Sequence, residues 1–383
     1  MKYFARNKTT FKQEGLAAVV VFLVALPLSL GIAVATGASP TAGIISAAIG
    51  GIIVGSFAGC PLQVSGPAAG LITIVAEIIH KFGLEQLGLI VFLAGIIQLI
   101  FAALRLGPVF RAVAPSVIQG MLSAIGVSIF ASQFHVMVGD SPNHGPIENL
   151  LLIPNSLIQG LFPMDGSIYH MSALIGVVTI AVIVIWNFVP KSVKAIPPAL
   201  IGVVVSVLIS RLFQLPIKHL VLPDNVIQDL NIVDWGVVIP SFTDSPLMIA
   251  AFTVAFVATA ETLLTATAVD QLHSGERTKY NKEIFAQGLG NLFAGFLGVL
   301  PISGVIVRSA ANVSTGAKTR VSTILHGVLL VVFILIFPHV LEMIPTSCLA
   351  AILVYTGVKL VNYKAVFNIY SYRRAEFIIY LIT

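Results

Sequence analysis

Residues 300–309 read LPISGVIVRS, and this stretch decides the fold that the rest of the sequence can adopt. Among apolar neighbours it holds Pro301, Gly304, Arg308 and two serines. A proline followed by a glycine favours extended chain that passes into a helix only afterwards. The first turn of such a helix has backbone N–H groups without intrahelical partners, and these groups attract anions. We therefore expect an interrupted helix here that supplies half of an anion site.

A second stretch, far upstream, has the same plan. Residues 60–70 read CPLQVSGPAAG: a proline, a short mixed run, a Ser-Gly pair and then small residues. Two interrupted helices at corresponding positions in the two halves of a membrane protein indicate the binding site of a transporter. The alternative is that proline and glycine only kink two packed helices. The recurrence in both halves favours the transporter.

The composition excludes a soluble protein. The chain has 383 residues, of which 57% are hydrophobic and 10% charged, with a mean hydropathy of +1.00. Soluble domains carry roughly 25% charged residues. The net charge is +5, but the basic residues are scattered over short loops without interleaved aromatic residues, which excludes nucleic acid as a partner. The two cysteines, Cys60 and Cys348, are predicted to be buried thiols rather than a disulfide framework.

Apolar runs predict a polytopic all-α protein in a lipid bilayer, since about 20 apolar residues in a helix cross the hydrocarbon core. Two of the runs are too short to cross as helices alone. Each becomes long enough if a short extended strand before its glycine supplies the rest, where protein or a watery cavity must shield the backbone. The last run ends at Thr383, so we expect truncation within the thirteenth span. The predicted spans are 16–35, 40–58, 66–79, 87–104, 115–138, 168–189, 197–213, 247–268, 283–299, 304–313, 321–337, 346–361 and 375 onward.

The basic residues predict the orientation of these spans. The positive-inside rule places loops rich in Lys and Arg in the cytoplasm. Loop 139–167 has no Lys or Arg, and loop 214–246 has only Lys218, so both are predicted outside. The N-terminus is then cytoplasmic, and the second half starts outside, as an inverted repeat requires. Residues 1–383 form one transporter domain, with repeats at about 16–213 and 247–383, the second incomplete. The predicted cytoplasmic loops are 105–114, 190–196, 269–282, 314–320 and 362–374.

Two smaller features complete the map. Gly43, Ala47, Gly51 and Gly55 recur every four residues and predict a face on which helices pack closely. Loop 139–167 is rich in proline and is interpreted as an external cap without chemistry.

Five motifs are spread over nearly the whole chain: ALPLSLGIA (25–33), VSGP (64–67), NKEIFAQGLGNL (281–292), SGVIVRS (303–309) and GAKTR (316–320). Together they resemble the SulP anion permeases, relatives of the animal sulfate, chloride and bicarbonate exchangers. The resemblance implies a 7+7 inverted-repeat fold shared with the uracil permeases, in which a core domain moves against a gate domain. It also implies a homodimer and a cytoplasmic STAS domain, which we expect to be absent from this sequence. We predict a bacterial inner membrane location.

The two short spans define the predicted anion site. If both begin near mid-membrane, their N-termini face each other, and each contributes about +0.5 of a charge. An anion between them is expected to contact backbone rather than polar side chains. The predicted contacts are Ala68 and Ala69 on one side and Gly304, Val305 and Ile306 on the other, with Ser65 and Ser303 beside them.

Arg308 adds a full charge to this site. An arginine inside the membrane costs at least about 2.5 kcal/mol, so we expect it to face the anion cavity. The alternative is an arginine that extends to the cytoplasmic surface. The resemblance implies an anion-influencing arginine at this position. It also implies that Leu28 and Ile32 lie on the gate-side wall of the pocket.

Glu261 is the candidate for coupling, because it is the only carboxylate within span 247–268. A buried carboxylate is either protonated or paired with a cation. Thr265, one turn further on, offers a hydroxyl oxygen on the same face. The pair is therefore predicted to hold H+ or Na+; the alternative is a glutamate bonded to a helix terminus. Sodium-coupled family members have aspartate here and threonines near the helix starts, where this chain has Ala68 and Ile306, so the coupling ion stays open.

The predicted function is secondary active transport of sulfate or bicarbonate, coupled to H+ or Na+, with no other cofactor and no metal site. The charge of the site is about +1, from two helix ends (about +1 together), Arg308 (+1) and ionised Glu261 (−1). Such a site is suited to a monovalent anion. Protonated Glu261 raises the charge to about +2, suited to a divalent one. The alternatives are a nucleobase permease of the uracil or xanthine type, a passive anion channel and a chloride exchanger. An intramembrane enzyme would need paired aspartates or a Ser-His pair within the spans, and the sequence indicates neither.

Overall fold

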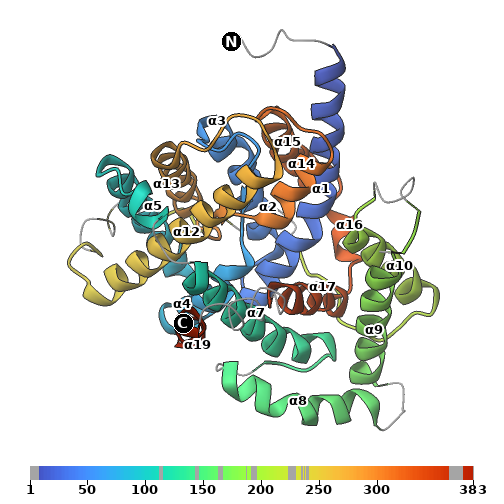
Figure 1. The fold of residues 1–383 in the computed structure, drawn as a ribbon. Coiled ribbons are helices and arrows are strands. Elements are labelled where there is room, and N and C mark those ends of the chain that lie inside the picture. The colour runs from blue at the N-terminus through green and yellow to red at the C-terminus, as the bar shows by residue number, and fades with distance from the viewer. Residues whose placement is uncertain are drawn as a thin grey trace. The chain divides into compact units, whose positions relative to one another are not determined.

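The structure is a computed structural model in which nearly all regular elements are helices (Figure 1). Contacts divide the chain into two compact units. Unit 1 comprises Met1–Ser29, Ala38–Arg111 and Pro223–Phe337, and unit 2 comprises Leu30–Gly37, Ala112–Leu222 and Pro338–Thr383. The described residues are 8–111, 115–142, 146–162, 167–186, 188–190, 196–222, 230–233, 236, 238, 241–361 and 374–382.

Unit 1 contains the two interrupted helices and the elements that hold them. The first helix, α1, passes from unit 1 into unit 2 after Ser29. The elements are α1 (Lys8–Thr36), α2 (Pro40–Ile49), the π-helix η1 (Gly50–Val54), α3 (Gly55–Phe57), β1 (Ser65–Gly66), the 3-10 helix η2 (Ala69–Leu71), α4 (Ile72–Phe82), α5 (Leu84–Ala103), α6 (Gly107–Arg111), α12 (Ser245–Leu272), α13 (Tyr280–Phe296), β2 (Ser303–Gly304), α14 (Ile306–Ser314) and α15 (Val321–Ile336).

Unit 2 is built from the remaining helices around its own core. Met137 and Val138 pack there with Ala350, Ala351 and Val354. The elements besides the end of α1 are α7 (Pro115–Met137), α8 (Pro146–Leu161), α9 (Ile168–Trp186), α10 (Pro198–Leu212), α16 (Pro338–Glu342), α17 (Thr346–Leu360) and α19 (Arg374–Ile382).

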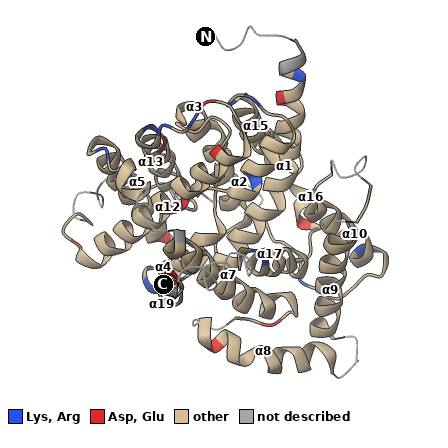
Figure 2. Ribbon diagram, viewed as in Figure 1, with Lys and Arg blue, Asp and Glu red and all other residues tan. Residues whose placement is uncertain are grey.

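The predicted spans agree with these helices to within a few residues at most ends, and six of the helices are long and apolar enough to cross a membrane. Charged residues lie mainly on helix ends and connecting segments (Figure 2). The interpretation of 139–167 as a loop is wrong, because residues 146–161 form α8. Pro146 takes the first helical position, where no N–H is needed, and Pro154 is tolerated within the helix. Parts of the predicted loops, including 191–195, 223–229 and 362–373, lie outside the described residues.

Both predicted interruptions are confirmed. The chain runs through β1 before η2 and α4, and through β2 before α14. The two strands pair with each other in antiparallel register, Ser65 with Gly304 and Gly66 with Ser303. The helical segments begin at Ala69 and Ile306 rather than at residues 66 and 304, because each Ser-Gly pair belongs to a strand.

Two pairs of helices approach each other closely through glycines. A Cβ atom at Gly126 of α7 would lie 2.6 Å from the carbonyl oxygen of Gly357 in α17, and one at Gly357 would lie 2.7 Å from that of Gly126. Helices α5 and α13 approach similarly through Gly88, Gly95, Gly288 and Gly295. In both pairs one helix lies in the predicted first repeat and the other in the predicted second repeat.

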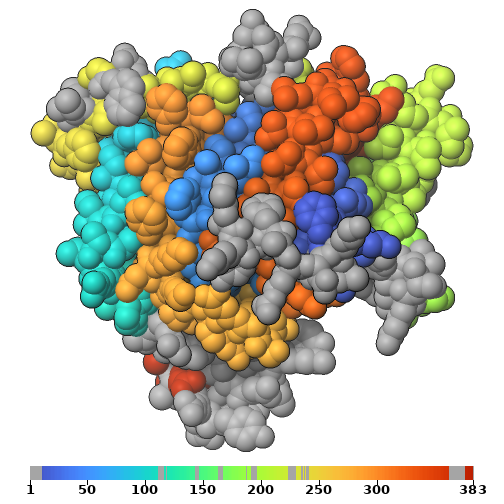
Figure 3. Space-filling model, turned by 90° about the horizontal axis from the view of Figure 1, so that it is seen from above, coloured from blue at the N-terminus to red at the C-terminus, as the bar shows by residue number. Residues whose placement is uncertain are grey.

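The small-residue face on α2 and η1 is confirmed at two positions. A Cβ atom at Gly51 would lie 2.7 Å from the ring of His326, and one at Gly55 would lie 2.9 Å from Thr323 Oγ1, both on α15. Gly50 meets the backbone of Ser65 in β1. In Figure 3 this segment lies between α13 and α15, which it contacts on either side. The glycines therefore let η1 fit between β1 and α15.

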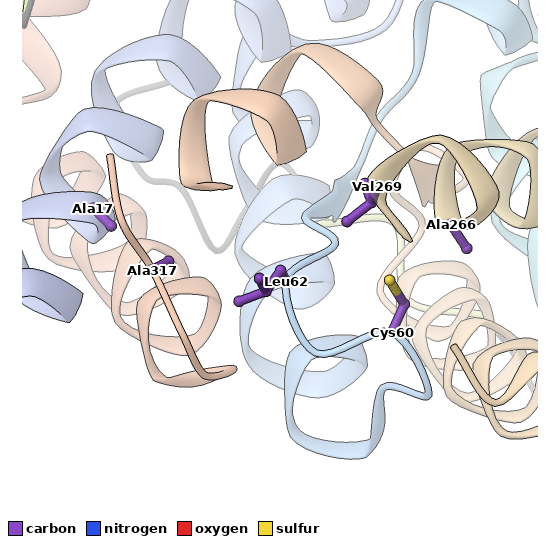
Figure 4. Packing of buried hydrophobic residues seen from close by; sticks show 6 residues of the cluster. All are labelled: Ala17, Cys60, Leu62, Ala266, Val269 and Ala317. Carbon is purple, nitrogen blue, oxygen red and sulfur yellow. The ribbon is translucent and has the colours of Figure 1, made fainter. Parts of the chain in front are cut away.

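The segment before β1 packs on an apolar cluster (Figure 4). Leu62 lies between Ala17 and Ala317 on one side and Cys60, Ala266 and Val269 on the other. Both cysteines are free and buried, as predicted.

Candidate functional site

The extended segment before β1 is held by one buried carboxylate. Glu283, in the first turn of α13, is fully buried. It accepts hydrogen bonds from the N–H groups of Gly59 (2.7 Å) and Cys60 (2.8 Å) and from Gln63 Nε2 (2.9 Å). Backbone that is not helical must find such partners inside a membrane. Glu283 therefore stabilises the break in the first repeat.

The segment before β2 is held in the same way by amide and hydroxyl groups. Asn291 of α13 accepts from the N–H of Ile302 (2.7 Å) and donates to its carbonyl oxygen (2.9 Å). Ser46 of α2 donates to the carbonyl oxygen of Leu300 (2.9 Å). One helix, α13, thus anchors the interruptions of both repeats.

Further bonds tie the start of α14 to the segment before β1. The N–H of Val305 donates to the carbonyl oxygen of Val64 (2.9 Å), and the N–H of Val64 donates to Ser309 Oγ (2.9 Å). Asn312 Nδ2 donates to the carbonyl oxygen of Leu62 (3.0 Å). The two interrupted helices therefore start from one hydrogen-bonded crossing.

The predicted backbone donors need a correction at two residues. The N–H of Gly304 donates to Thr262 Oγ1 (3.0 Å), and that of Val305 is bonded to Val64. These groups are already satisfied and do not point to an anion. Ala68, Ala69 and Ile306 stay as predicted donors. Ala69 and Ile306 are half-buried, and Ala68 is buried.

Glu261 lies where both interrupted elements meet. Its Oε2 accepts from Ser303 Oγ of β2 (2.8 Å), and its carboxylate accepts from the N–H of Gly70 in η2. A Cβ atom at Gly70 would lie 2.7 Å from Oε1, so the backbone approaches closely. Thr265 Oγ1 donates to the carbonyl oxygen of Gly304 (3.0 Å). The carboxylate is thus bonded to a helix start, which was one alternative for it, and it occupies a donor that an anion would also seek.

Arg308 is fully buried, which excludes the alternative in which it extends to the surface. Its Nη2 donates to Ser29 Oγ (2.9 Å) and, at 3.4 Å, to the carbonyl oxygen of Pro67. Its Nε and Nη1 have no hydrogen-bond partner. Among the residues that the structure describes, no carboxylate lies within ion-pair distance of Arg308. A buried charge without a counter-ion is costly, so this guanidinium is suited to an anionic ligand.

The remaining predicted side chains have less definite places. Ser303 contacts Glu261, whereas Ser65 Oγ is buried without a partner. Leu28 and Ile32 are both buried in α1, but Ile32 belongs to the part of α1 in unit 2. Their position on a pocket wall stays a prediction.

Sequence reasoning missed the residues that support the site. Glu283 and Asn291 lie in the quoted motif 281–292, at a spacing that puts both on one side of a helix, but the motif does not reveal their partners. Ser29, which accepts from Arg308, lies in the quoted motif 25–33. Thr262 is one residue from Glu261 and binds the neighbouring backbone.

One Ser-His pair joins the predicted span 115–138 to the stretch 139–167, so it does not lie within the spans. Ser156 Oγ of α8 lies 2.7 Å from Nδ1 of His135 in α7, and Asp140 Oδ2 lies 2.9 Å from the same nitrogen. His135 Nε2 is bonded to the carbonyl oxygen of Asn149 (3.0 Å). A catalytic triad needs serine and aspartate on opposite ring nitrogens. The cluster therefore joins α7 to α8 and does not form a nucleophile.

Replacement of Gly66 by alanine tests how tightly the strand crossing packs on Arg308. The added methyl group would meet Arg308 Nη1 and would lie 3.3 Å from the Cα of Ala47. We expect Gly66→Ala to destabilise the fold by about 1–3 kcal/mol and to lower the apparent affinity for the anion. Thermal unfolding in detergent and uptake by proteoliposomes measure the two effects.

The control is Gly15→Ala in α1, where no atom lies within 4 Å of the added carbon. It should unfold at the temperature of the parent or above, because alanine favours a helix. Equal unfolding temperatures and equal uptake for the two variants would show that the crossing has room for a side chain.

Comparisons with known proteins place this arrangement among transporters. A sequence model of the Sulfate permease family matches residues 11–383. The putative sulfate transporter YvdB of Bacillus subtilis is 28% identical over 97% of this chain and 68% of its own length. The bicarbonate transporter BicA of Picosynechococcus is 29% identical over 91% of this chain and 61% of its own length. The chain thus spans about two thirds of these relatives.

Solved structures show the same fold. The transmembrane domain of a cyanobacterial bicarbonate transporter BicA superposes with a TM-score of 0.85 at 24% identity, over 98% of this chain and 95% of that one. The structure of SLC26A9 gives a TM-score of 0.79 at 17% identity, over 98% of this chain and 61% of that one.

Proposed function

The chain belongs to the sulfate permease family, and from this premise we propose that it is a secondary active transporter of an inorganic anion, sulfate or bicarbonate. The observation that carries the proposal is Arg308, buried with two unpaired donors beside the starts of two interrupted helices. The helix starts add about one further positive charge together. An anion held there would supply the missing counter-charge.

We propose that Glu261 couples this transport to an ion gradient. Its carboxylate takes the N–H of Gly70 at the start of the first interrupted helix. A proton on Glu261 would remove a negative charge from the site and weaken its hold on that donor, so proton and anion would bind together. Sodium is the second candidate, because oxygen atoms of Glu261 and Thr265 are bonded to the neighbouring residues Ser303 and Gly304.

The proposal also covers the membrane location, the orientation and the oligomeric state of the protein. Two of the similar transporters, YvdB and BicA, come from bacteria. We propose a bacterial inner membrane location with a cytoplasmic N-terminus, from the distribution of Lys and Arg over the loops. We also propose a homodimer, which the family resemblance implies.

A competition panel tests the transported anion. We expect proteoliposomes with the purified chain to take up labelled sulfate or bicarbonate against its concentration gradient when a pH or sodium gradient is imposed. Each uptake is challenged by the other anion, chloride, fumarate and uracil. Uptake that only equilibrates would indicate a passive channel, and inhibition by uracil alone would indicate a nucleobase permease.

A further inference from the structure

Helix α8 (Pro146–Leu161) has a packed face and a polar stripe, and between them lies a broad apolar face that the protein leaves uncovered. In a helix, residues three or four apart share a face. The packed face contains the buried residues Asn149, Ser156 and Gly160. The polar stripe contains Glu148, Asn155 and Gln159, which are all exposed. The exposed apolar residues of α8 form the apolar face.

The packed face fixes the rotation of α8 about its axis. The carbonyl group of Asn149 and the hydroxyl of Ser156 are bonded to His135 in α7. A Cβ atom at Gly160 would lie 3.2 Å from Ala173 Cβ in α9. These contacts fix the helix at three points along its length. The apolar face therefore points away from the protein.

Asp140 strengthens this attachment at neutral pH. Burial alone would raise the pKa of its carboxyl group, but hydrogen bonds with His135 and Ser156 outweigh burial and lower the pKa below its ordinary value. The carboxylate is therefore charged at neutral pH, and it accepts from Ser156 Oγ at 2.8 Å.

The apolar face covers about 140 degrees of the helix circumference, as estimated from 100 degrees per residue. Ile147 and Leu151 are each 74% exposed, and Phe162, just beyond the helix, is 63% exposed. No charged residue lies on this face. Its other members are Leu150, Pro154, Leu157, Ile158 and Leu161.

The neighbouring helices indicate what covers this face. α7 and α9 are both long and apolar enough to cross the membrane, and α8 connects the end of one to the start of the other. The chain leaves the apolar face at Phe162 and enters α9 at Ile168. On α9 the exposed side chains of Leu174, Val177 and Ile185 continue the uncovered apolar surface into the spanning region. Figure 1 shows α8 lying across the end of α9.

We propose that α8 lies in the lipid interface of the bilayer, with this apolar face among the acyl chains and its polar stripe toward water. Amphipathic helices of this kind bury their apolar face about 5–10 Å into the boundary between headgroups and acyl chains. The apolar face joins the lipid-covered surface of α9 without an intervening charged group. The absence of Lys and Arg from α8 means that apolar area, rather than attraction to anionic lipids, provides the binding.

Site-directed spin labelling in proteoliposomes tests the placement. Single cysteines replace Leu151 and Leu157 on the apolar face and Asn155 and Gln159 on the polar stripe. The native cysteines Cys60 and Cys348 are buried, so the introduced cysteines are the thiols that react with the label. Collision of each nitroxide with oxygen, which concentrates in lipid, is compared with collision with a nickel complex, which stays in water.

We expect the ratio of oxygen to nickel collisions to be several-fold higher at Leu151→Cys and Leu157→Cys than at Asn155→Cys and Gln159→Cys. Frequent nickel collisions at all four positions would place the face in water and overturn the proposal. Low rates with both reagents at the two apolar positions would also overturn it, because a second copy of the chain would then cover the face. Normal uptake by each labelled variant shows that the fold is retained.

Discussion

Glu261→Gln is expected to abolish uphill accumulation of the anion while exchange or downhill movement of the anion continues. Glutamine has nearly the same shape, and its single oxygen can accept from the N–H of Gly70 while its NH2 group donates to Ser303 Oγ, so the crossing of the two strands stays intact. It has no charge and takes up no proton. The parent site alternates between a charged and a protonated Glu261, whereas the variant has only the neutral form. A proton gradient therefore cannot drive accumulation of the anion in the variant. The measurement is the ratio of internal to external anion under an imposed pH gradient, repeated with a sodium gradient.

Glu77→Gln is the matched control, since Glu77 is an exposed carboxylate on the first interrupted helix, α4. It should accumulate anion as the parent does. Full accumulation by Glu261→Gln would assign coupling to another group, while the proposed anion site would be unaffected. Loss of equilibration as well as accumulation would show that Glu261 is needed for binding itself.

Arg308→Met is the second change with a large expected effect. It removes the buried charge that faces the two helix starts and leaves a side chain of similar length. Loss of one partner of a buried charge pair costs about 2–5 kcal/mol, so the apparent affinity for the anion should fall roughly 30-fold or more. Titration of uptake against anion concentration measures this fall.

Although Arg308→Met should lower the affinity for the anion, it should not lower the stability of the fold. Arg308 has two unpaired donors and no carboxylate within ion-pair distance among the described residues. Replacing such a charge by an apolar group is often neutral or stabilising. We expect the unfolding temperature of Arg308→Met in anion-free buffer to equal or exceed that of the parent. The control, Arg211→Met on the exposed end of α10, should change neither property. If Arg308→Met binds the anion with unchanged affinity, Arg308 is not part of the anion site.

The interruptions could be predicted from the sequence because they depend on local residues. Pro301 and Gly304 disfavour a continuous helix through their own conformational preferences, and Pro61 and Gly66 do the same in the upstream stretch. Because the membrane interior offers no partners to unpaired backbone groups, the interrupted segment must be extended chain that other parts of the protein shield. Helix α8 escaped prediction for a related reason, since its prolines suggested a loop although one of them stands at a favoured first position.

The bonding of the site could not be predicted, because it depends on contacts between distant parts of the chain. The N–H of Val305 is unavailable because the strand register brings it to Val64. Glu283 and Asn291 look like ordinary polar residues of one helix until their partners, Gly59 and Ile302, are located. Glu261 was identifiable as the one carboxylate of its span, but its bond to Gly70 was not.

The pairing of Ser65 with Gly304 also has a consequence for how the protein is made. Each strand has backbone groups that only the other strand satisfies, and one belongs to the first repeat and the other to the second. During synthesis the first Ser-Gly segment enters the membrane long before its partner leaves the ribosome. Until then its polar groups need water, the insertion machinery or a chaperone. The proposed anion site is therefore among the last parts to assemble, and a nascent chain stopped before residue 304 cannot complete it.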